Sequence, residues 1–340
     1  MKRRVRNTLF LAGMLLCGVG IFGIAGRREN LTVPAYVLTY AENQTEDYPT
    51  TRAAERFAEM VYEQTGGMVE IQVHAGSSLG DEMSMVEQLQ FGGIDFARVS
   101  LSNLANGLPK LNVLQMPYLY TSSEHMWDVL DGELGEEFME AFSGSNMVPL
   151  SWYDAGSRCF YTTKNPVQSL EDLKGLRIRV PDSELMRDMI TSMGAVPVPE
   201  AYEQVYSSLE TGKIDGAENN WPSYEAMGHN EVARYYTVDD HMRIPEAQLV
   251  SAQTWEKLPK EYQEVIRRCA QESAEYERRL WKEEERLAKS RVIAEGCIVI
   301  ELSQEEKESF REAVLPLYEK YCPEYLGLVE QIIALGEEEK

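Results

Sequence analysis

One local pattern, an amphipathic helix that ends at a glycine and leads into a strand, occurs twice in this chain of 340 residues. Residues 92–97 read GGIDFA and residues 212–217 read GKIDGA, and each follows apolar residues at helical spacing. Glycine suits the end of a helix because it adopts positive φ without strain. The pattern predicts an α/β protein. Its recurrence favours two similar lobes, although such joints occur in every α/β protein.

The flanking segments alternate in the same way. Residues 33–40 and 69–74 are typical of strands, and a helix from about residue 50 to residue 65 should connect them as a βαβ unit. Residues 260–291 are dense in charged residues and should form a single long helix. Its predicted apolar stripe consists of Val265, Ile266, Cys269, Tyr276, Leu280 and Leu287. At about 150 residues per domain, the length also favours two lobes.

Charge and cysteine usage exclude several classes of protein. The chain has 56 acidic and 33 basic residues and a net charge of −23, so nucleic acid and anionic membrane surfaces are poor partners. The cysteines beyond the N-terminal segment show no CxxC or Cys/His spacing that would indicate zinc, and no Walker loop or HExxH motif occurs. We therefore expect neither a metal nor a cofactor.

The N-terminal segment has the composition of an export signal. Lys2, Arg3, Arg4 and Arg6 precede an uncharged run from residue 8 to residue 26. Small residues at the end of this run suit signal peptidase, and the run is also about long enough to stay as an anchor. We predict that residues 1–26 are a signal peptide or an N-terminal anchor, which places the rest in the periplasm or on the outer face of the cytoplasmic membrane.

The segment from residue 156 to residue 221 indicates an anion site. Arg158 and Arg179 each lie in a short strand-like run, and Asn219 and Asn220 stand where a third such run ends. Strand ends in α/β sheets point toward the crevice where ligands bind. Arginine holds a carboxylate with two parallel hydrogen bonds, so the segment predicts a carboxylate ligand.

One motif favours a different class of protein. Residues 76–80 read GSSLG, which fits GxSxG between a predicted strand and a predicted helix, as a nucleophile elbow requires. A triad could combine Ser78 with His241 and either Asp239 or Asp240. No HGGG-type oxyanion segment is present and the elbow comes very early for a hydrolase sheet, so a Gly/Ser loop before a helix explains the motif better. A serine hydrolase is therefore the alternative hypothesis.

A series of short motifs in one order carries a resemblance to a known family. They are LGDE at residues 79–82, GSR at 156–158, EDLKGLRIRVP at 171–181, GAVP at 194–197 and DGAEN at 215–219. The chain resembles the extracytoplasmic solute-binding proteins of tripartite ATP-independent periplasmic (TRAP) transporters, the dicarboxylate and sugar-acid binding family. The resemblance implies a monomer with a two-lobed periplasmic-binding-protein-like fold and a long helix crossing both lobes. Lobe 1 would comprise residues 33–155 and 245–284, and lobe 2 residues 156–244 and 285–340.

The resemblance also implies roles for residues in the second lobe. Arg179 matches the arginine that makes paired contacts with the ligand carboxylate. Arg158 matches a second arginine that contacts the carboxylate or a neighbouring hydroxyl, and Asn219 matches an asparagine that holds the other carboxylate oxygen. Glu218, which precedes it, is expected to be structural.

In the first lobe, Asn43, Glu82 and Ser100 match positions that face the remainder of the ligand. A carboxylate such as Glu82 disfavours a second anion but accepts hydrogen bonds from sugar hydroxyls, which favours a uronate or related sugar acid. His241 matches a position near the cleft, or it is an ordinary core histidine. Arg98 is a departure, because many relatives are apolar there.

The resemblance therefore implies a receptor without catalysis that captures an organic acid outside the cell and delivers it to a TRAP permease in the membrane. A sensory ligand-binding module with the same fold is a further alternative, since the two would share the site and differ only in the partner.

Overall fold

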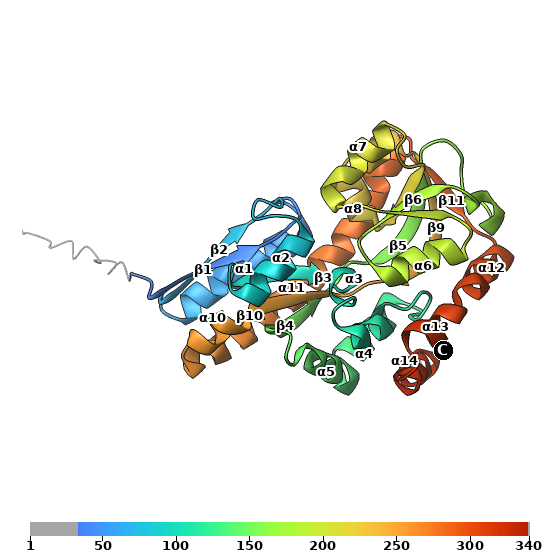
Figure 1. Ribbon diagram of the computed structural model, residues 1–340. Helices are drawn as coiled ribbons and strands as arrows, with labels where there is room; N and C mark the ends of the chain where they lie inside the picture. Colours follow the sequence, from blue (N-terminus) through green and yellow to red (C-terminus); the bar gives the residue numbers. More distant parts are fainter. Residues whose placement is uncertain (1–32, 339–340) are drawn as a thin grey trace, which may run out of the picture. The chain divides into compact units, whose positions relative to one another are not determined.

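The computed structural model describes residues 33–338 and confirms an α/β protein with two sheets (Figure 1). The predicted signal or anchor, residues 1–26, lies outside the described residues. Within residues 33–338, no helix combines the length and apolar character needed to cross a membrane. The first sheet has the strand order β2-β1-β3-β10-β4 and contains β1 (Tyr36–Ala41), β2 (Val69–His74), β3 (Phe96–Ser100), β4 (Met147–Tyr153) and β10 (Glu246–Ser251).

The first sheet begins with the predicted βαβ unit. Helix α1 (Pro49–Gln64) connects β1 to the parallel strand β2, and α2 (Glu82–Phe91) connects β2 to β3, which is parallel to β1. Phe57 and Val61 on α1 are fully buried, as the apolar spacing predicted. Strand β10 follows β9 of the second sheet and pairs antiparallel with both β3 and β4.

The second sheet combines parallel and antiparallel pairs. Strand β5 is antiparallel to its neighbours β8 and β9, whereas β6 is parallel to β7 and β8, and β11 is parallel to β9. Its strand order is β11-β9-β5-β8-β6-β7, from β5 (Ser157–Thr162), β6 (Arg177–Val180), β7 (Val196–Pro199), β8 (Gly216–Asn219), β9 (Tyr235–Arg243) and β11 (Ile298–Glu301).

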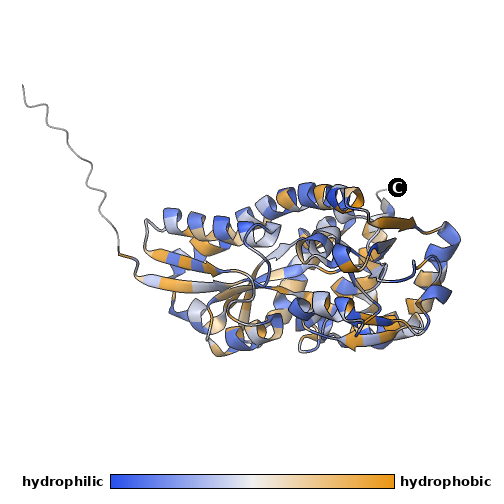
Figure 2. Cartoon of the chain, turned by 90° about the horizontal axis from the view of Figure 1, so that it is seen from above, coloured by the Kyte–Doolittle hydropathy of each residue, from blue (hydrophilic) through white to orange (hydrophobic). Residues whose placement is uncertain are grey.

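The helices pack against the two sheets and around their ends. In Figure 2 they alternate hydrophilic and hydrophobic residues, as expected of helices with one buried face. Those not yet named are α3 (Leu101–Leu104), η1 (Pro109–Gln115), α4 (Ser123–Leu130), α5 (Glu133–Met139), η2 (Glu140–Phe142), η3 (Leu170–Leu173), α6 (Glu184–Ser192), η4 (Tyr202–Gln204), α7 (Val205–Glu210), α8 (Trp221–Ala226), α9 (His229–Val232), α10 (Ala252–Lys257), α11 (Lys260–Ala294), α12 (Gln304–Val314), α13 (Pro316–Tyr321) and α14 (Leu326–Glu338).

The predicted long helix is α11, with 35 residues. It contacts α1 and β4 beside the first sheet and α8 beside the second, so one helix runs along both lobes (Figure 1). Its buried face differs from the predicted stripe in the middle of the helix, where Glu277 and Trp281 are buried while Leu280 and Leu287 are only half-buried. The reason is that this part packs on the chain between the sheets, where Glu277 accepts a hydrogen bond from the Asp154 N–H (2.9 Å).

The chain passes between the sheets at residues 154–156, from β4 to β5, and at residues 244–245, from β9 to β10. After β11, helices α12 to α14 continue from the second sheet. Helix α13 contacts η1 and α14 contacts α4, both of which belong to the segment predicted as lobe 1. The predicted lobe boundaries, and the assignment of this last segment to lobe 2, stay predictions.

Two glycines of the repeated pattern have the predicted geometry. Gly92 ends α2 with φ 71°, and Gly212 follows α7 with φ 69°. Both values lie in the left-handed region that glycine adopts without steric conflict. Each joint therefore turns the chain from a helix into a strand of the sheet.

Candidate functional site

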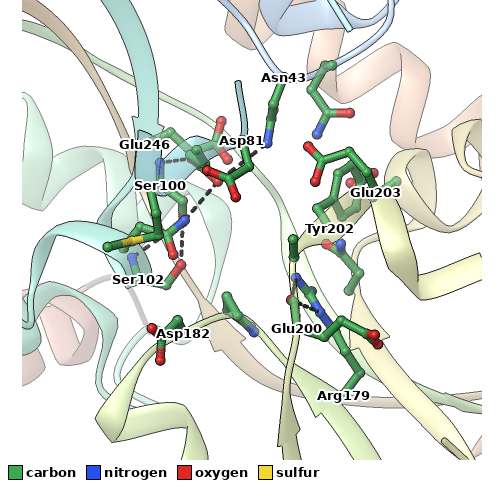
Figure 3. A pocket seen from close by; sticks show the side chains of 18 of the residues that line it. Asn43, Asp81, Ser100, Ser102, Arg179, Asp182, Glu200, Tyr202, Glu203 and Glu246 are labelled. Carbon is green, nitrogen blue, oxygen red and sulfur yellow. Dashed lines mark hydrogen bonds between the residues drawn. The ribbon is translucent and has the colours of Figure 1, made fainter. Parts of the chain in front are cut away.

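A cavity of about 460 Å³ is lined by residues attached to both sheets (Figure 3). This volume lies within the range of small-molecule sites, about 300–1,000 Å³. The structure brings together at this cavity six of the seven residues predicted to bind ligand, namely Arg179, Arg158, Asn219, Glu82, Asn43 and Ser100. His241 is not among the lining residues.

The strand order explains why these side chains meet. Asn43 follows β1, Ser100 ends β3, Arg179 lies near the end of β6 and Asn219 ends β8. Each of these strands is parallel to a neighbour in its own sheet. Because ligands bind beyond the carboxyl ends of parallel strands, both sheets present their binding edge to the same cavity.

Arg179 is buried without an acidic partner. Its Nε and Nη2 atoms donate to the Glu200 backbone carbonyl at 2.9 and 2.6 Å (Figure 3), and it forms no ion pair with any carboxylate of residues 33–338. Burial lowers the pKa of its guanidinium. A buried cation that faces a cavity without a counter-charge favours an anionic ligand. The neighbouring Arg177 instead bonds Asp215 (2.8 Å) on a half-exposed surface.

Arg158 is also buried but, unlike Arg179, it is paired with a carboxylate. Its Nε atom donates to Glu218 Oε2 (2.5 Å) and its Nη2 atom to Oε1 (2.9 Å), a bidentate pair. Burial by itself would raise the pKa of Glu218, but the positive charges of Arg158 and His241 outweigh this effect and lower the pKa to about 2. Glu218 therefore neutralises and orients Arg158, the structural role that the sequence predicted for it.

His241 lies behind this pair. Its Nδ1 atom donates to Asp239 Oδ2 (2.8 Å), and its Nε2 atom lies 3.4 Å from Glu218 Oε2. Burial by itself would lower the pKa of His241, but the carboxylates of Asp239 and Glu218 outweigh this effect and raise the pKa to about 9. The protonated imidazole thus continues a chain of alternating charges from Asp239 to Arg158. The structure connects His241 to the cavity through Glu218.

Several buried polar atoms of the cavity lining have no hydrogen-bond partner within residues 33–338. They are the Tyr202 hydroxyl, Gln44 Oε1 and Glu200 Oε2. Asn219 Oδ1 accepts the Asn220 N–H (2.9 Å), which leaves its NH₂ group as a donor. Since buried polar groups are normally satisfied, this lining suits a polar ligand. The sequence analysis missed Tyr202 and Gln44, because their burial depends on the closing of two sheets around the cavity.

Glu82 is the first residue of α2 and also lines the cavity. Its Oε1 atom accepts the Ser100 N–H (2.5 Å), and its Oε2 atom accepts from Asn103 Nδ2 (2.8 Å) and Asn43 Nδ2 (3.4 Å). Burial raises the pKa of Glu82. Glu82 therefore lies both at the N-terminus of a helix and in the wall of the cavity.

The structure adds Arg98 and Glu246 to the cavity lining. Arg98 is buried, with Nε 3.2 Å from Glu42 Oε2 and Nη1 3.0 Å from Glu246 Oε1. One signal was available in the sequence, since Arg98 stands between the apolar residues Ala97 and Val99 in a strand-like run. A buried charge requires partners. Nothing local identified Glu246 as one of them.

The structure does not assemble the alternative triad. Ser78 is exposed in the turn between β2 and α2. Asp239 and His241 bond each other on β9, buried in the other sheet. The GxSxG match is therefore a turn that leads into a helix.

Comparison with known proteins agrees with this site. Residues 40–324 match the family described as bacterial extracellular solute-binding protein, family 7. A solute-binding protein of Chromohalobacter salexigens is 38% identical over 278 residues, covering 82% of this chain and 82% of that protein. A TRAP periplasmic solute-binding protein from a Bradyrhizobium species, in complex with α/β-D-galacturonate, has a TM-score of 0.85 and 38% identity, and the match covers 87% of this chain and 99% of that one.

A second structure, a TRAP periplasmic solute-binding protein from Roseobacter denitrificans with bound β-D-glucuronate, has a TM-score of 0.85 and 36% identity. The match covers 88% of this chain and 99% of that one. The shared fold is that of a substrate receptor and not that of a hydrolase.

Proposed function

This chain belongs to family 7 of the bacterial extracellular solute-binding proteins, and we propose that it binds a hexuronate such as glucuronate or galacturonate and delivers it to a TRAP membrane permease. Members of this family act outside the cytoplasm and work with membrane permease subunits. The proposal of a uronate is supported by the galacturonate and glucuronate bound to two similar proteins.

The observation that carries the proposal is the buried guanidinium of Arg179 on the cavity wall, which has no carboxylate partner among residues 33–338. Leaving a charge buried and unpaired is unfavourable, and a ligand carboxylate would relieve it with two hydrogen bonds. Each hydrogen bond to a charged group contributes about 1.5–3 kcal/mol. Arg179 alone can therefore account for a requirement for an acid.

The remaining residues would bind different groups of the ligand. Arg158, already neutralised by Glu218, would act as a hydrogen-bond donor to the carboxylate or to an adjacent hydroxyl. The Asn219 NH₂ group would hold the second carboxylate oxygen. On the first sheet, Glu82, Asn43 and Ser100 present oxygen and nitrogen atoms that suit sugar hydroxyls.

We propose that this binding involves no catalysis and that the receptor is a monomer. The two carboxylates that could act as catalytic groups already accept hydrogen bonds that orient their neighbours, Glu218 from Arg158 and Glu82 from the Ser100 N–H. No step of bond breaking is needed to explain any of them.

Isothermal titration of the protein with glucuronate and galacturonate tests the proposal, with glucose and galactose as neutral controls. Arg179→Ala should weaken uronate binding at least about 100-fold, since two charge-assisted hydrogen bonds are lost. Arg177→Ala is the matched control, because Arg177 is on the same strand but bonds Asp215 outside the cavity. Unchanged uronate affinity in Arg179→Ala would refute the site, and binding of the neutral sugars would refute the requirement for an acid.

Delivery is tested separately from binding. Uptake of radiolabelled uronate into cells that carry the cognate permease should require this protein. If the protein binds uronates but uptake proceeds equally without it, the receptor serves another partner, such as a sensory kinase.

A further inference from the structure

Three carboxylates surround one arginine on the first-sheet side of the cavity. The Arg98 guanidinium is bound on one side by Glu42, through Nε (3.2 Å) and Nη2. Its Nη1 atom lies 3.0 Å from Glu246 Oε1 and 3.6 Å from Glu82 Oε1. Glu82 and Glu246 line the cavity, whereas Glu42 is fully buried and lies outside its lining.

This side of the cavity carries an excess of negative charge once Glu246 is ionised, because three carboxylates then face one guanidinium. Burial raises the pKa of Glu246 to about 8, and the negative charges of Glu82 and Glu42 act in the same direction while Arg98 opposes them. The cavity lining contains three arginines within residues 33–338. Arg98 and Arg158 are engaged by carboxylates, and Arg179 is on the other sheet.

A ligand carboxylate on the Arg98 side would therefore meet like charge. The guanidinium of Arg98 already bonds Glu42, Asn43 and Glu246, so it offers few donors to a newcomer. A second carboxylate would lose its hydration without gaining a free cation. A hydroxyl group in the same place can donate to Glu82 or Glu246 and is neutral.

We propose that Glu82 and Glu246 form a charge filter that rejects any ligand with a carboxylate at both ends. This proposal rests on the proposed function. Aldarates are sugar acids with a carboxylate at each end, and the filter makes this protein prefer uronates over the matching aldarates and over C4-dicarboxylates. Arg179 binds the single carboxylate, and the hydroxylated end of the sugar faces Glu82 and Glu246. In Figure 3, Glu246 and Ser100 lie on one side of the cavity and Arg179 and Tyr202 on the other.

Calorimetric titration with matched acids tests the filter. At pH 9, above the pKa of about 8 of Glu246, wild-type protein should prefer galacturonate over galactarate, and glucuronate over glucarate, by at least about 100-fold, or about 2.7 kcal/mol, as expected for an uncompensated buried charge. Glu246→Gln keeps the side-chain shape and removes the charge. It should reduce this preference at least about 10-fold by strengthening aldarate binding, and Glu82→Gln should act in the same direction.

Asp182→Asn is the matched control. Asp182 also lines the cavity, but its carboxylate bonds Arg187 (2.6 Å) and lies apart from the Arg98 cluster, so the preference should not change. Equal binding of uronates and aldarates by the wild type would overturn the filter. So would a preference that persists unchanged in both glutamine variants, because shape would then explain it. Absence of uronate binding would instead refute the proposed function.

The pH dependence of the wild type provides a second measurement that requires no variant. Glu246 faces Arg98, Glu82, Glu42 and Arg158, and burial raises the pKa of its carboxyl to about 8. Galactarate keeps both charges between pH 6 and pH 9. Its affinity should therefore fall about 10-fold more than that of galacturonate over this range. Parallel pH profiles for the two acids would overturn the filter.

Discussion

Two buried arginines on the cavity wall, Arg179 and Arg98, have opposite surroundings. Arg179 is 4% exposed and bonds only a backbone carbonyl, whereas Arg98 is 1% exposed and contacts three carboxylates. The second sheet thus contributes a cation with no carboxylate in contact among residues 33–338, and the first contributes three carboxylates around one cation, more than it can balance once Glu246 is ionised. The ligand that suits both has one charged end and one neutral, hydroxylated end.

The comparison shows that the residue type does not decide its role. A guanidinium whose carboxylate partners belong to the protein stabilises the fold, and a guanidinium without them is available to a ligand. Arg158 lies between these cases, since Glu218 balances its charge while the side chain still lines the cavity. The predictions below test this distinction.

The largest effect is expected on stability. Arg98→Met should lower the free energy of unfolding by about 3–5 kcal/mol, because it leaves the fully buried carboxylate of Glu42 without its partner. Arg179→Met should leave the stability of the ligand-free protein unchanged or raise it, since it removes an unpaired buried charge. Urea unfolding at pH 7 measures both. Equal losses in the two variants would mean that the two arginines do not differ in this way.

His241→Gln should reduce stability in a pH-dependent manner. Because the pKa of His241 is raised to about 9, its contribution is fully present below its usual value of 6.5 and is lost as the pH rises through 9. The variant should therefore be less stable than wild type by on the order of 3 kcal/mol below pH 6.5, with the difference shrinking toward pH 9. Chemical unfolding of both proteins across this range measures the difference. A constant difference would show that the imidazole charge is not involved.

Asn219→Ala should weaken uronate binding about 10- to 100-fold, less than the loss of Arg179, because one amide contact to the carboxylate is removed. Titration calorimetry measures the loss. Stability should change little in comparison, and a wild-type affinity in this variant would exclude Asn219 from the ligand contacts.

Ser78→Ala should have the smallest effect. The side chain is exposed and outside the cavity lining, so affinity should stay within about 0.5 kcal/mol of wild type. The protein should also resist labelling by a fluorophosphonate. Covalent labelling of Ser78 would revive the hydrolase hypothesis.

The sequence predicted those features that depend on short segments. The α/β class, helix α1, strand β2 and the long helix α11 follow from apolar periodicity, and the structure confirms them. The ordered motifs predicted the family, which the comparison confirms. The motifs and strand ends also predicted six residues that the structure places around one cavity; their contacts with ligand stay predictions.

Long-range pairing was not predictable in the same way. Glu246 meets Arg98 because β10 returns next to β3, with Glu246 opposite Ser100 in the register. Glu218 meets Arg158 because β8 pairs with β5, a contact between residues 60 positions apart. The sequence analysis treated Arg98 as a departure from the family pattern and could not identify its partners.

What the sequence by itself determined is therefore the set of elements, the family and the strand ends that carry polar residues, because hydrophobic periodicity and short motifs are local properties. Only the tertiary structure decided which arginine keeps a free charge. The state of a buried guanidinium depends on the carboxylates that other strands bring within a few ångströms, and strand order is fixed by the packing of the whole sheet. For Arg179 no carboxylate of residues 33–338 arrives, and for Arg98 three do.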